Sequence, residues 1–360
     1  MDAKKKLAII VANYFEQCSG GAELQAYYLA KTAKERGWEV YHIFISNGQP
    51  YQNSLNIHLL PIKKSTVASK AGNVKFIYAI HVWKYLKRIK PDAVYQRSAS
   101  ALTGICALYA KYYKINTTYH IASDNDLTDI KTYSLFKLIE TLLTSYGQKH
   151  SRTIIAQTHT QSEMYLSKHS ANVTEIIPNG HPVPSIPYHK SHIVSIVWVA
   201  NMKRQKQPEI FINLAKELKK SLNVTCTMIG RIDEYGTVVK SAVEDGIIIA
   251  LGELSNSEVN RVLEKSHILV NTSKYEGFSN TFIQAWMREN PVVSLNVDPD
   301  NIITTYELGY LSQTFTQLVT DTKKLICDHK LREYMAMKAK KYAIMNYSID
   351  NLNMLLAAIS

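Results

Sequence analysis

The chain has 360 residues, a net charge of +12 and an apolar content of 46 %. Its length exceeds what one hydrophobic core usually supports and predicts two domains of about 150 to 200 residues each. The composition argues against an integral membrane protein, because no apolar run approaches the roughly 20 residues that cross a bilayer. Its four cysteines lie far apart, so neither a zinc site nor a disulfide scaffold is indicated, and a cytoplasmic location is expected.

The first apolar segment follows three lysines, residues 4–6, and reads LAIIVA. A secretory signal peptide needs an apolar region of roughly 7 to 15 residues with a small-residue cleavage site behind it. This segment is shorter and has no such site. We therefore expect a buried first β-strand.

Positive charge is concentrated in the first half of the chain. Between Glu39 and Asp124 the only acidic residue is Asp92, whereas eleven residues are lysine or arginine. Within residues 74–90, large apolar side chains recur near helical spacing with lysines between them: Phe76, Ile77, Ile80, Trp83 and Leu86. Such a helix fits an anionic membrane surface, or it packs on its own sheet with a solvated basic face. Nucleic acid is disfavoured as a partner, since no nucleic-acid-binding module is recognisable.

Strand-like and helical segments alternate in both halves, which is typical of doubly wound parallel sheets. In the first half, strands are expected at 7–12, 39–45, 92–95, 116–121, 153–156 and 174–177, with helices at 22–36, 99–113 and 134–149. In the second half, strands are expected at 193–199, 224–229, 247–250, 267–271 and 291–294. The proline-rich segment 178–190 predicts a linker between them. Two Rossmann-like α/β domains, 1–185 and 186–344, follow from this pattern.

Ligands of such sheets bind beyond the carboxyl ends of the strands, which directs attention to the loops there. Gly20 and Gly21 follow the first strand and precede a helix, where backbone N–H groups can approach a phosphate or substrate closely. A tight turn without a ligand explains this pair equally well. His120 ends a middle strand, where a near-neutral pKa would suit proton exchange with a substrate. A structural histidine is the alternative.

Two acidic triplets, 124–126 and 298–300, resemble the DxD metal motif of single-domain sugar transferases. Asx turns or helix caps explain such short triplets better. We therefore expect no metal site.

Cations precede the predicted helix that begins near Pro208. The loop after the preceding strand contains Lys203, Arg204 and Lys206. Together with the N-terminus of the helix, these cations would hold a diphosphate. An exposed basic loop is the alternative.

The segment YEGFSNTFIQAW, residues 275–286, follows another strand. Its turn, with Gly277 and Phe278, carries Glu276, while Gln284 lies on the helix behind it; Ser279 or Asn280 is expected to cap that helix. The backbone amides of residues 279–281 would point at an anion. A carboxylate for hydroxyls, amides for phosphates and a side-chain amide together suit a nucleotide sugar.

Seven short features, taken in chain order, resemble those of a known protein family. They are GGAE, the strand-ending His120, IIPNG, KQPE, MIGR, LGEL, and NTSKYEGFSNTFIQAW followed by PVVSL. In this order they resemble a family-four retaining glycosyltransferase of GT-B architecture, over nearly the whole chain. The resemblance implies an activated nucleotide-sugar donor, no metal ion or other cofactor, and transfer with retention at the anomeric carbon. It also implies that a C-terminal helix, about 345–360, crosses back onto the first domain.

By position, Glu276 resembles the first acid of the family's paired-acid motif, which holds donor-sugar hydroxyls. Gln284 stands where the second acid normally binds the ribose. Its amide oxygen still accepts a hydrogen bond, so weaker or altered ribose binding is expected. Lys206 matches the phosphate-binding lysine, but the preceding arginine of the family is Asn201 here, and Arg204 or Lys203 is expected to supply that charge.

The resemblance gives three groups of candidate site residues. The catalytic ones are His120 and Glu276. The donor-binding ones are Asn201, Arg204, Lys206, Gly230, Arg231, Leu254, Gly277, Phe278, Ser279, Asn280, Thr281 and Gln284. The acceptor-side ones are Gly20, Gly21 and Glu23.

The basic, aromatic first half resembles family members that dock on the cytoplasmic membrane leaflet and extend lipid-linked glycans of lipopolysaccharide, O-antigen or capsule. A UDP- or GDP-sugar is the expected donor, and a glycan or lipid-linked glycan the expected acceptor. Two alternatives stay open: a GT-B sugar-nucleotide epimerase, which needs no acceptor, and a non-catalytic nucleotide-sugar-binding scaffold, suggested by Asn201 and Gln284.

Overall fold

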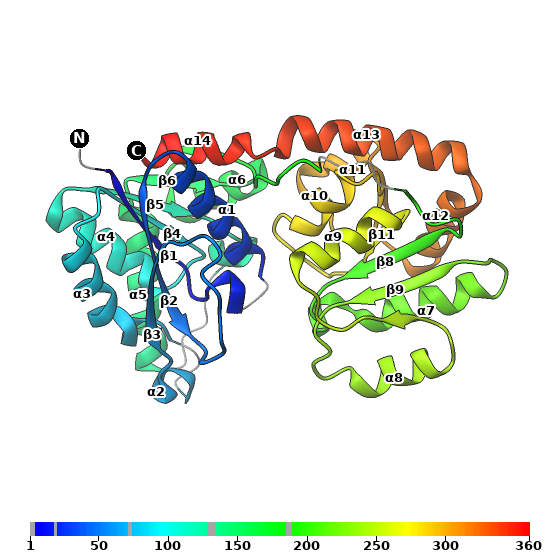
Figure 1. Cartoon of the computed structure of the whole chain (residues 1–360), viewed down its shortest axis with the longest axis horizontal. Helices are drawn as coiled ribbons and strands as arrows, with labels where there is room; N and C mark the ends of the chain where they lie inside the picture. Colours follow the sequence, from blue (N-terminus) through cyan, green and yellow to red (C-terminus); the bar gives the residue numbers. More distant parts are fainter. Residues whose placement is uncertain (1–3, 18–19, 71–73, 129–133, 185–188) are drawn as a thin grey trace. The chain divides into compact units, whose positions relative to one another are not determined.

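The computed structural model describes residues 4–17, 20–70, 74–128, 134–184 and 189–360. Residue 185, at which we expected the domain boundary, lies outside these ranges, as do Pro187 and Cys18. The chain forms two compact units, Met1–Gly180 with Ile349–Ser360, and His181–Ser348. Each unit contains one parallel sheet with helices on both faces (Figure 1), so the predicted fold class is confirmed.

The sheet of the first unit has seven strands in the order β3-β2-β1-β4-β5-β6-β7. The strands are β1 (Lys6–Ile10), β2 (Glu39–Ser46), β3 (His58–Lys63), β4 (Ala93–Arg97), β5 (Asn116–His120), β6 (Thr153–Ala156) and β7 (Glu175–Ile176). All neighbouring pairs are parallel. The strand order reverses between β1 and β4, so the loops after these strands diverge and leave room for a ligand there.

Successive β1 residues point to opposite faces of this sheet and enter two cores. Leu7 and Ile9 pack with helices α1 (Gly21–Glu35) and α14 (Asp350–Ile359). Ala8 and Ile10 pack with α3 (Ala79–Ile89) and α4 (Ala101–Tyr113). The remaining helices of the unit are α2 (Thr66–Lys70), α5 (Leu135–His150) and α6 (His159–His169), with 3₁₀ turns η1 (Phe15–Gln17), η2 (Phe76–Tyr78) and η3 (Asp124–Leu127). The last helix of the chain thus completes the core of the first unit.

The second unit has a six-stranded sheet in the order β10-β9-β8-β11-β12-β13. Its strands are β8 (Ser195–Val199), β9 (Thr225–Ile229), β10 (Ile249–Ala250), β11 (Ile268–Asn271), β12 (Val292–Ser294) and β13 (Gly309–Leu311). The strand order reverses between β8 and β11, which are hydrogen-bonded neighbours. The loops after these two strands therefore adjoin each other.

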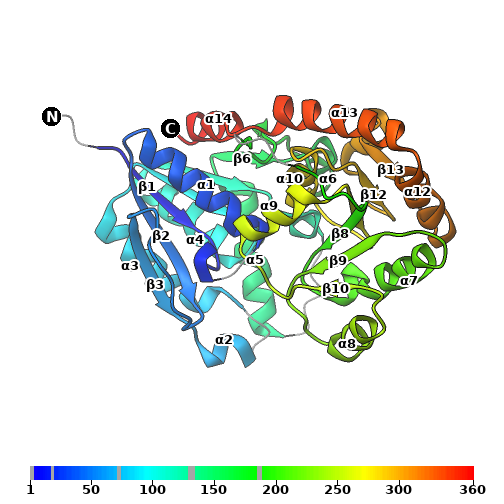
Figure 2. The ribbon, with the colours of Figure 1, turned by 45° about the vertical axis from the view of Figure 1, so that its right-hand side comes forward.

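Two helical layers cover this second sheet. One includes α7 (Pro208–Lys219), α8 (Gly236–Glu244) and α12 (Phe315–Cys327), which share a core with Ile196 and Trp198; Figure 2 shows α7 and α8 beside β9 and β10. The other includes α9 (Asn256–Lys265), α10 (Asn280–Trp286) and α13 (His329–Tyr347), packed around Val197. Short turns η4 (Arg204–Lys206), η5 (Pro299–Asn301) and α11 (Ile302–Thr305) connect the elements.

Most predicted strands appear within one or two residues of their expected bounds, but β3 and β13 were not predicted. Strand β3 contains Pro61 and lies at the edge of its sheet, where a missing backbone donor is tolerated. Strand β13 is only three residues long and also lies at an edge. A proline within an apolar run argues against a strand at β3, and the three residues of β13 leave little periodicity to detect.

The five apolar residues named within residues 74–90 do not share one face as expected, but the second alternative, a helix that packs on its own sheet, is observed. Leu86 is buried in the core with Val82 and Ile89, whereas Ile80 is 66 % exposed. Helix α3 therefore packs on its own sheet. In the described part of the chain, no helix is long and apolar enough to cross a membrane.

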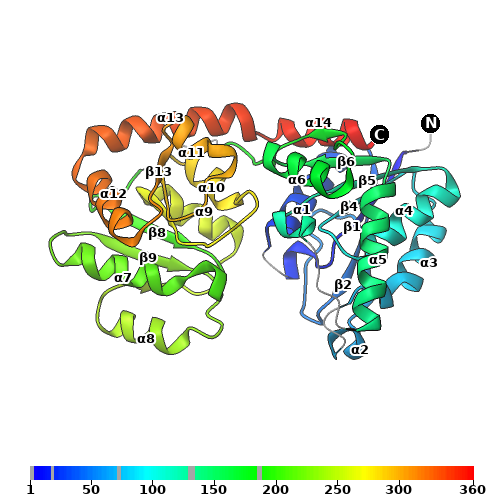
Figure 3. The same cartoon turned by 180° about the vertical axis from the view of Figure 1, so that it is seen from behind.

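Helices α4 and α5 approach each other closely at two glycines, and Figure 3 shows these helices side by side with α3. A Cβ atom at Gly104 would lie 2.2 Å from the carbonyl oxygen of Leu143, and one at Gly147 would lie 2.3 Å from the carbonyl carbon of Thr103. Backbone atoms cannot retreat as a flexible side chain can. The two glycines therefore set the separation of these helices.

We predict that Gly147→Ala destabilises the first unit by about 1 to 3 kcal/mol, the usual range for overpacking, although alanine favours helix. Gly236→Ala is the control, because the nearest atom to its Cβ would be Ile232 Cγ2 at 4.0 Å. Urea unfolding followed by circular dichroism compares the two. Equal midpoints for both variants would contradict the prediction.

Candidate functional site

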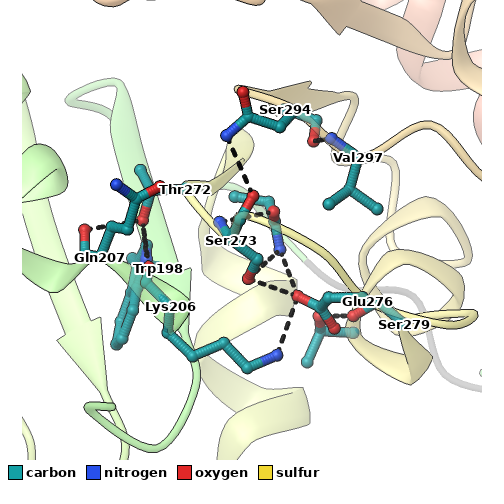
Figure 4. A network of polar contacts seen from close by, with 12 residues as sticks. Trp198, Lys206, Gln207, Thr272, Ser273, Glu276, Ser279, Ser294 and Val297 are labelled. Atoms are coloured by element: carbon teal, nitrogen blue, oxygen red, sulfur yellow. Dashed lines mark hydrogen bonds and ion pairs between the residues drawn. The ribbon is translucent and has the colours of Figure 1, made fainter. Parts of the chain in front are cut away.

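Glu276 and Lys206, predicted from separate segments, form an ion pair in the second unit. Glu276 lies in the loop after β11 and Lys206 ends the turn η4 after β8. Lys206 Nζ lies 3.0 Å from Glu276 Oε1, and the two side chains are 19 % and 12 % exposed. Figure 4 shows the lysine extending toward the carboxylate. The adjacency of β8 and β11 brings the two loops together.

The two oxygens of Glu276 have different surroundings. Oε1 accepts hydrogen bonds from Asn271 Nδ2 at 2.8 Å and Ser273 Oγ at 2.6 Å, in addition to the lysine contact. Among the described residues, no donor contacts Oε2. One oxygen thus fixes the carboxylate, and the other remains able to accept hydrogen bonds from a ligand.

The charge of this carboxylate is stabilised in the folded protein. Burial by itself would raise the pKa of Glu276, but the Lys206 ammonium and the hydrogen bonds from Ser273 and Asn271 outweigh burial and hold the pKa below its ordinary value. Glu276 is therefore ionised at neutral pH. A negative oxygen is a strong acceptor for a hydrogen bond from a ligand hydroxyl.

A second set of contacts fixes the loop that carries Lys206. Thr272 Oγ1 accepts from Trp198 Nε1 at 2.9 Å and faces the backbone oxygen of Lys206 at 2.7 Å, to which it donates (Figure 4). The backbone N–H of Lys274 donates to the carbonyl of Gln205 at 2.8 Å. The lysine and the glutamate are therefore presented by two loops that are bonded to each other.

Lys203 and Arg204 precede Lys206 and are exposed. Neither forms an ion pair with a residue in the described ranges. Both cations thus remain available to an anionic ligand.

Asn201, Gly230 and Arg231 lie together where the loops after β8 and β9 meet. Asn201 Oδ1 accepts from the backbone N–H of Arg231 at 3.2 Å, and the Arg231 side chain is paired with Asp233 at 2.7 Å. Gly230 has φ +141°, and a Cβ there would lie 1.8 Å from the carbonyl oxygen of Ala200. Only glycine fits this contact. Asn201 therefore fixes backbone where the family's arginine would supply charge.

Gln284 is 4 % exposed, and its Nε2 donates to Asn260 Oδ1 on α9 at 2.9 Å. Its Oε1 makes no hydrogen bond with a described residue, so this oxygen can still accept one. Leu254 lies elsewhere, in the wall of an open cavity of about 730 Å³ that Glu258 and Arg261 also line. Among the described residues, no other candidate donor-binding residue lines that cavity.

The predicted cap of α10 is only partly correct. Ser279 is the N-cap residue, but its side chain makes no capping bond and instead contacts Thr281 Oγ1 at 2.8 Å. Asn280 begins the helix and its Oδ1 lies 2.8 Å from His181 Nε2. Phe278 is 6 % exposed in the core, while Gly277 is half-buried. Since α10 has only seven residues, its positive end is weaker than we expected.

In the first unit, His120 is 1 % exposed and its Nδ1 lies 2.9 Å from Tyr95 Oη and 3.1 Å from Arg97 NH1. The expectation of a near-neutral pKa is wrong. Burial and then the charge of Arg97 hold the pKa of His120 well below its ordinary value. The ring is therefore neutral at pH 7 and is a poor proton donor in general acid catalysis.

The acceptor-side candidates form a compact turn in the same unit. Gly20 is the N-cap of α1, which begins at Gly21, and Asn13 Nδ2 donates to Glu23 Oε1 at 2.9 Å. A Cβ at Gly20 would lie 2.1 Å from Glu23 Oε2. The absence of a side chain at residue 20 therefore lets the Glu23 carboxylate lie against the backbone.

The acidic triplets serve as turns and caps, in agreement with the sequence interpretation. Asp126 Oδ2 accepts from the backbone N–H of Ala122 at 2.8 Å, and Asp298 Oδ1 accepts from that of Ile303 at 2.7 Å. Within the described ranges, no group of three or more His, Cys, Asp or Glu side chains is placed to hold a metal ion.

The sequence did not single out the residues that hold Glu276 and His120 in place. Asn271 and Ser273 hold Glu276, and Tyr95 and Arg97 contact His120. Polar side chains at strand ends were the available signal, since Asn271 ends β11 and Arg97 ends β4. In the sequence, Arg97 is distinguished only as one of the basic residues of the first half.

Two family models match the chain in succession. Residues 19–183 match the model described as Glycosyltransferase Family 4, and residues 194–328 match the one described as Glycosyl transferases group 1. The chain belongs to the family-four glycosyltransferases. Its two matched segments correspond to the two α/β units, whose sheets carry the predicted GT-B architecture.

Solved structures share this fold along the whole chain. HepE from Anabaena in complex with UDP-glucose is 14 % identical, with 98 % of each chain covered and a TM-score of 0.75. Sucrose-phosphate synthase from Thermosynechococcus elongatus is 12 % identical, with 98 % of each chain covered and a TM-score of 0.77. WaaG, a glycosyltransferase involved in lipopolysaccharide biosynthesis, is 16 % identical over 98 % of this chain and 99 % of its own, with a TM-score of 0.73.

Curated relatives are similar over part of their length. Glycosyltransferase 1 domain-containing protein 1 of Xenopus tropicalis is 28 % identical over 222 residues, 56 % of this chain. A human relative, which is a phosphatidylinositol N-acetylglucosaminyltransferase subunit, is 22 % identical over 316 residues, 82 % of this chain. The match spans 64 % of the length of each relative.

Proposed function

We propose that the protein is a retaining, metal-independent glycosyltransferase that moves a sugar from a nucleotide-sugar donor to a glycan or lipid-linked acceptor. The observation that carries the proposal is the asymmetric setting of Glu276. One carboxylate oxygen is held by three donors, of which Lys206 is one, and the other has no partner among the described residues. Such a carboxylate suits sugar hydroxyls next to a cation that suits phosphate. A UDP-sugar is the first donor to test, since HepE was crystallised with UDP-glucose, and a GDP-sugar the second.

In this mechanism, a donor-sugar hydroxyl donates to Glu276 Oε2. Lys206 directs one of its three N–H groups at Glu276 and has two left for the diphosphate. The bond between the anomeric carbon and the phosphate oxygen breaks as negative charge grows on the leaving group, which Lys206 and the nearby Arg204 stabilise. The acceptor hydroxyl forms the new bond on the same side and passes its proton to the departing phosphate.

The first unit has a surface suited to a lipid-linked acceptor. On α5 the side chains of Leu135, Phe136 and Leu142 are 69 %, 44 % and 61 % exposed. The ring of Phe136 lies 5.9 Å from that of Phe76, which precedes α3 with its exposed Ile80. Lysines accompany these residues at positions 75, 84, 87 and 137. Apolar side chains among lysines favour an anionic bilayer surface.

We therefore assign the protein to surface-polysaccharide synthesis, in lipopolysaccharide, O-antigen or capsule, on the inner face of the cytoplasmic membrane. Two similar proteins support a lipid acceptor by their names. WaaG is involved in lipopolysaccharide biosynthesis, and the human relative is named as a phosphatidylinositol N-acetylglucosaminyltransferase subunit.

A thermal-shift screen with UDP-, GDP-, ADP- and CDP-sugars, each with and without EDTA, identifies the donor. At 100 times its Kd a ligand stabilises the fold by about 2.7 kcal/mol, which corresponds to a rise in Tm of about 5 °C or more for a unit of this size. The selected donor is then incubated with glycan acceptors, and proton NMR reports the anomeric configuration of the product. Epimerisation of the donor in the absence of an acceptor would favour the sugar-nucleotide epimerase. Binding of the donor without turnover would favour the non-catalytic scaffold.

A further inference from the structure

A buried polar network surrounds His120 at the carboxyl ends of β4 and β5. Arg97 ends β4 and lies opposite His120 in the sheet register. Arg97 is 2 % exposed, and its NH2 donates to Asn179 Oδ1 at 2.6 Å, which holds the guanidinium in place. Its NH1 lies 3.3 Å from Tyr95 Oη and 3.1 Å from His120 Nδ1. The arginine thus meets the histidine ring at one particular nitrogen.

The donors and acceptors in this network permit one arrangement. A guanidinium only donates hydrogen bonds, so Nδ1 of His120 must accept from Arg97 and cannot itself carry a proton. A hydroxyl can donate or accept, so the Tyr95 hydroxyl, 2.9 Å from Nδ1, would by itself be compatible with either tautomer. Tyr95 therefore does not decide the tautomer, whereas Arg97 does. Because the ring is neutral, its single proton resides on Nε2.

The remaining nitrogen, Nε2, is buried and makes no hydrogen bond with a described residue. A buried N–H donor without an acceptor is costly and is seldom left unpaired without a function. A hydroxyl or phosphate oxygen of a bound substrate would satisfy it. The charged and titratable groups around the ring are Tyr95 and Arg97 on β4, and the charge of Arg97 also acts on the carboxyl of Asp126 on η3.

We infer that Arg97 is a positioning residue that holds His120 as the Nε2–H tautomer, so that the histidine meets the substrate as a hydrogen-bond donor and not as a proton acceptor. The tautomer follows from the contacts alone. Only the identity of the acceptor, an oxygen of the nucleotide sugar or of the attacking glycan, rests on the proposed function.

The tautomer is measured directly by long-range ¹H–¹⁵N NMR of ¹⁵N-histidine-labelled protein. The chain has twelve histidines, and the spectrum of His120→Gln identifies the signals of His120 by their loss. We expect the Nε2–H pattern, unchanged between pH 6 and pH 8. An Nδ1–H pattern, or a titration midpoint near the ordinary value of about 6.5, would overturn the inference.

Two variants separate the roles of the neighbours. Tyr95→Phe removes a hydroxyl but leaves Arg97, and the Nε2–H pattern is expected to persist. In Arg97→Met, the ring can donate from Nδ1 to Tyr95 Oη, so an Nδ1–H population is expected to appear. If Tyr95→Phe alone changes the tautomer, the assignment to Arg97 is wrong. Should Arg97→Met fail to fold, the wild-type and Tyr95→Phe spectra still decide.

Activity supplies a separate readout. With the donor found in the screen, Arg97→Met is expected to lower kcat by about 10- to 100-fold, as losing a partner that orients a histidine does at metal sites. Wild-type kcat in a variant that shows the Nδ1–H pattern would refute the functional role of the tautomer. A wild-type protein without transferase activity would refute the proposed function and leave the NMR result standing.

Discussion

Glu276→Gln is expected to lower kcat by about 10²- to 10³-fold, the range seen when one group that stabilises a transition state is removed. The substitution keeps an oxygen that accepts from Lys206, Asn271 and Ser273. It replaces the unpartnered oxygen with an NH₂ group, which cannot accept from a sugar hydroxyl. Steady-state kinetics at saturating donor measures the loss of turnover.

Stability measurements show whether this loss reflects chemistry or folding. The Glu276→Gln protein should remain folded, with a urea midpoint lowered only by the loss of the carboxylate charge beside Lys206, because the contacts of Oε1 persist. Glu289→Gln is the matched control, since Glu289 pairs with Lys340 at 2.7 Å in the same unit and is not a candidate site residue. Its kcat should equal the wild-type value. A Glu276→Gln enzyme as fast as this control would remove Glu276 from the mechanism.

Most strands of both sheets could be predicted because buried parallel strands are short apolar runs between helices. Sheet order could not be predicted in the same way. Lys206 and Glu276 were each expected at a strand end, but their contact depends on β8 pairing with β11, two strands that are not consecutive in the chain. Likewise, Arg97 meets His120 because β4 pairs with β5. The candidate residues were therefore predictable singly, whereas their contacts required the fold.

Two predictions failed for reasons that a single sequence does not display. The apolar stripe of residues 74–90 assumed one continuous α-helix, but the 3₁₀ turn η2 precedes α3 and has three residues per turn. Within α3 the buried face carries Val82, Leu86 and Ile89, and Ile80 lies off that face and faces solvent. The pKa of His120 was expected near neutrality because the burial of its ring beside a cation was unknown.

Lys206→Met is expected to lower both kcat and stability, and the double variant Lys206→Met/Glu276→Gln separates the two effects. The single change removes the cation that faces the diphosphate, so kcat should fall by about 10²-fold or more. It also leaves a largely buried carboxylate with two neutral donors. Breaking a fully buried pair costs about 3 to 5 kcal/mol, so about 1 to 3 kcal/mol is expected for this partly exposed one.

The pH dependence of the stability shows whether the charge of Glu276 stabilises the fold. In the wild type the pKa of Glu276 is lowered on folding, so its contribution to stability is present above the unfolded pKa and is lost as pH falls through the folded one. The stability difference between wild type and Lys206→Met should therefore be largest above about pH 5 and shrink toward pH 3, as measured by urea unfolding.

A neutral amide needs no counter-charge, so the double variant Lys206→Met/Glu276→Gln should regain most of the stability at pH 7 while its kcat stays low. Recovery of kcat in the double variant would mean that the pair serves folding alone, and a stability loss independent of pH would mean that packing, not charge, holds Lys206 in place.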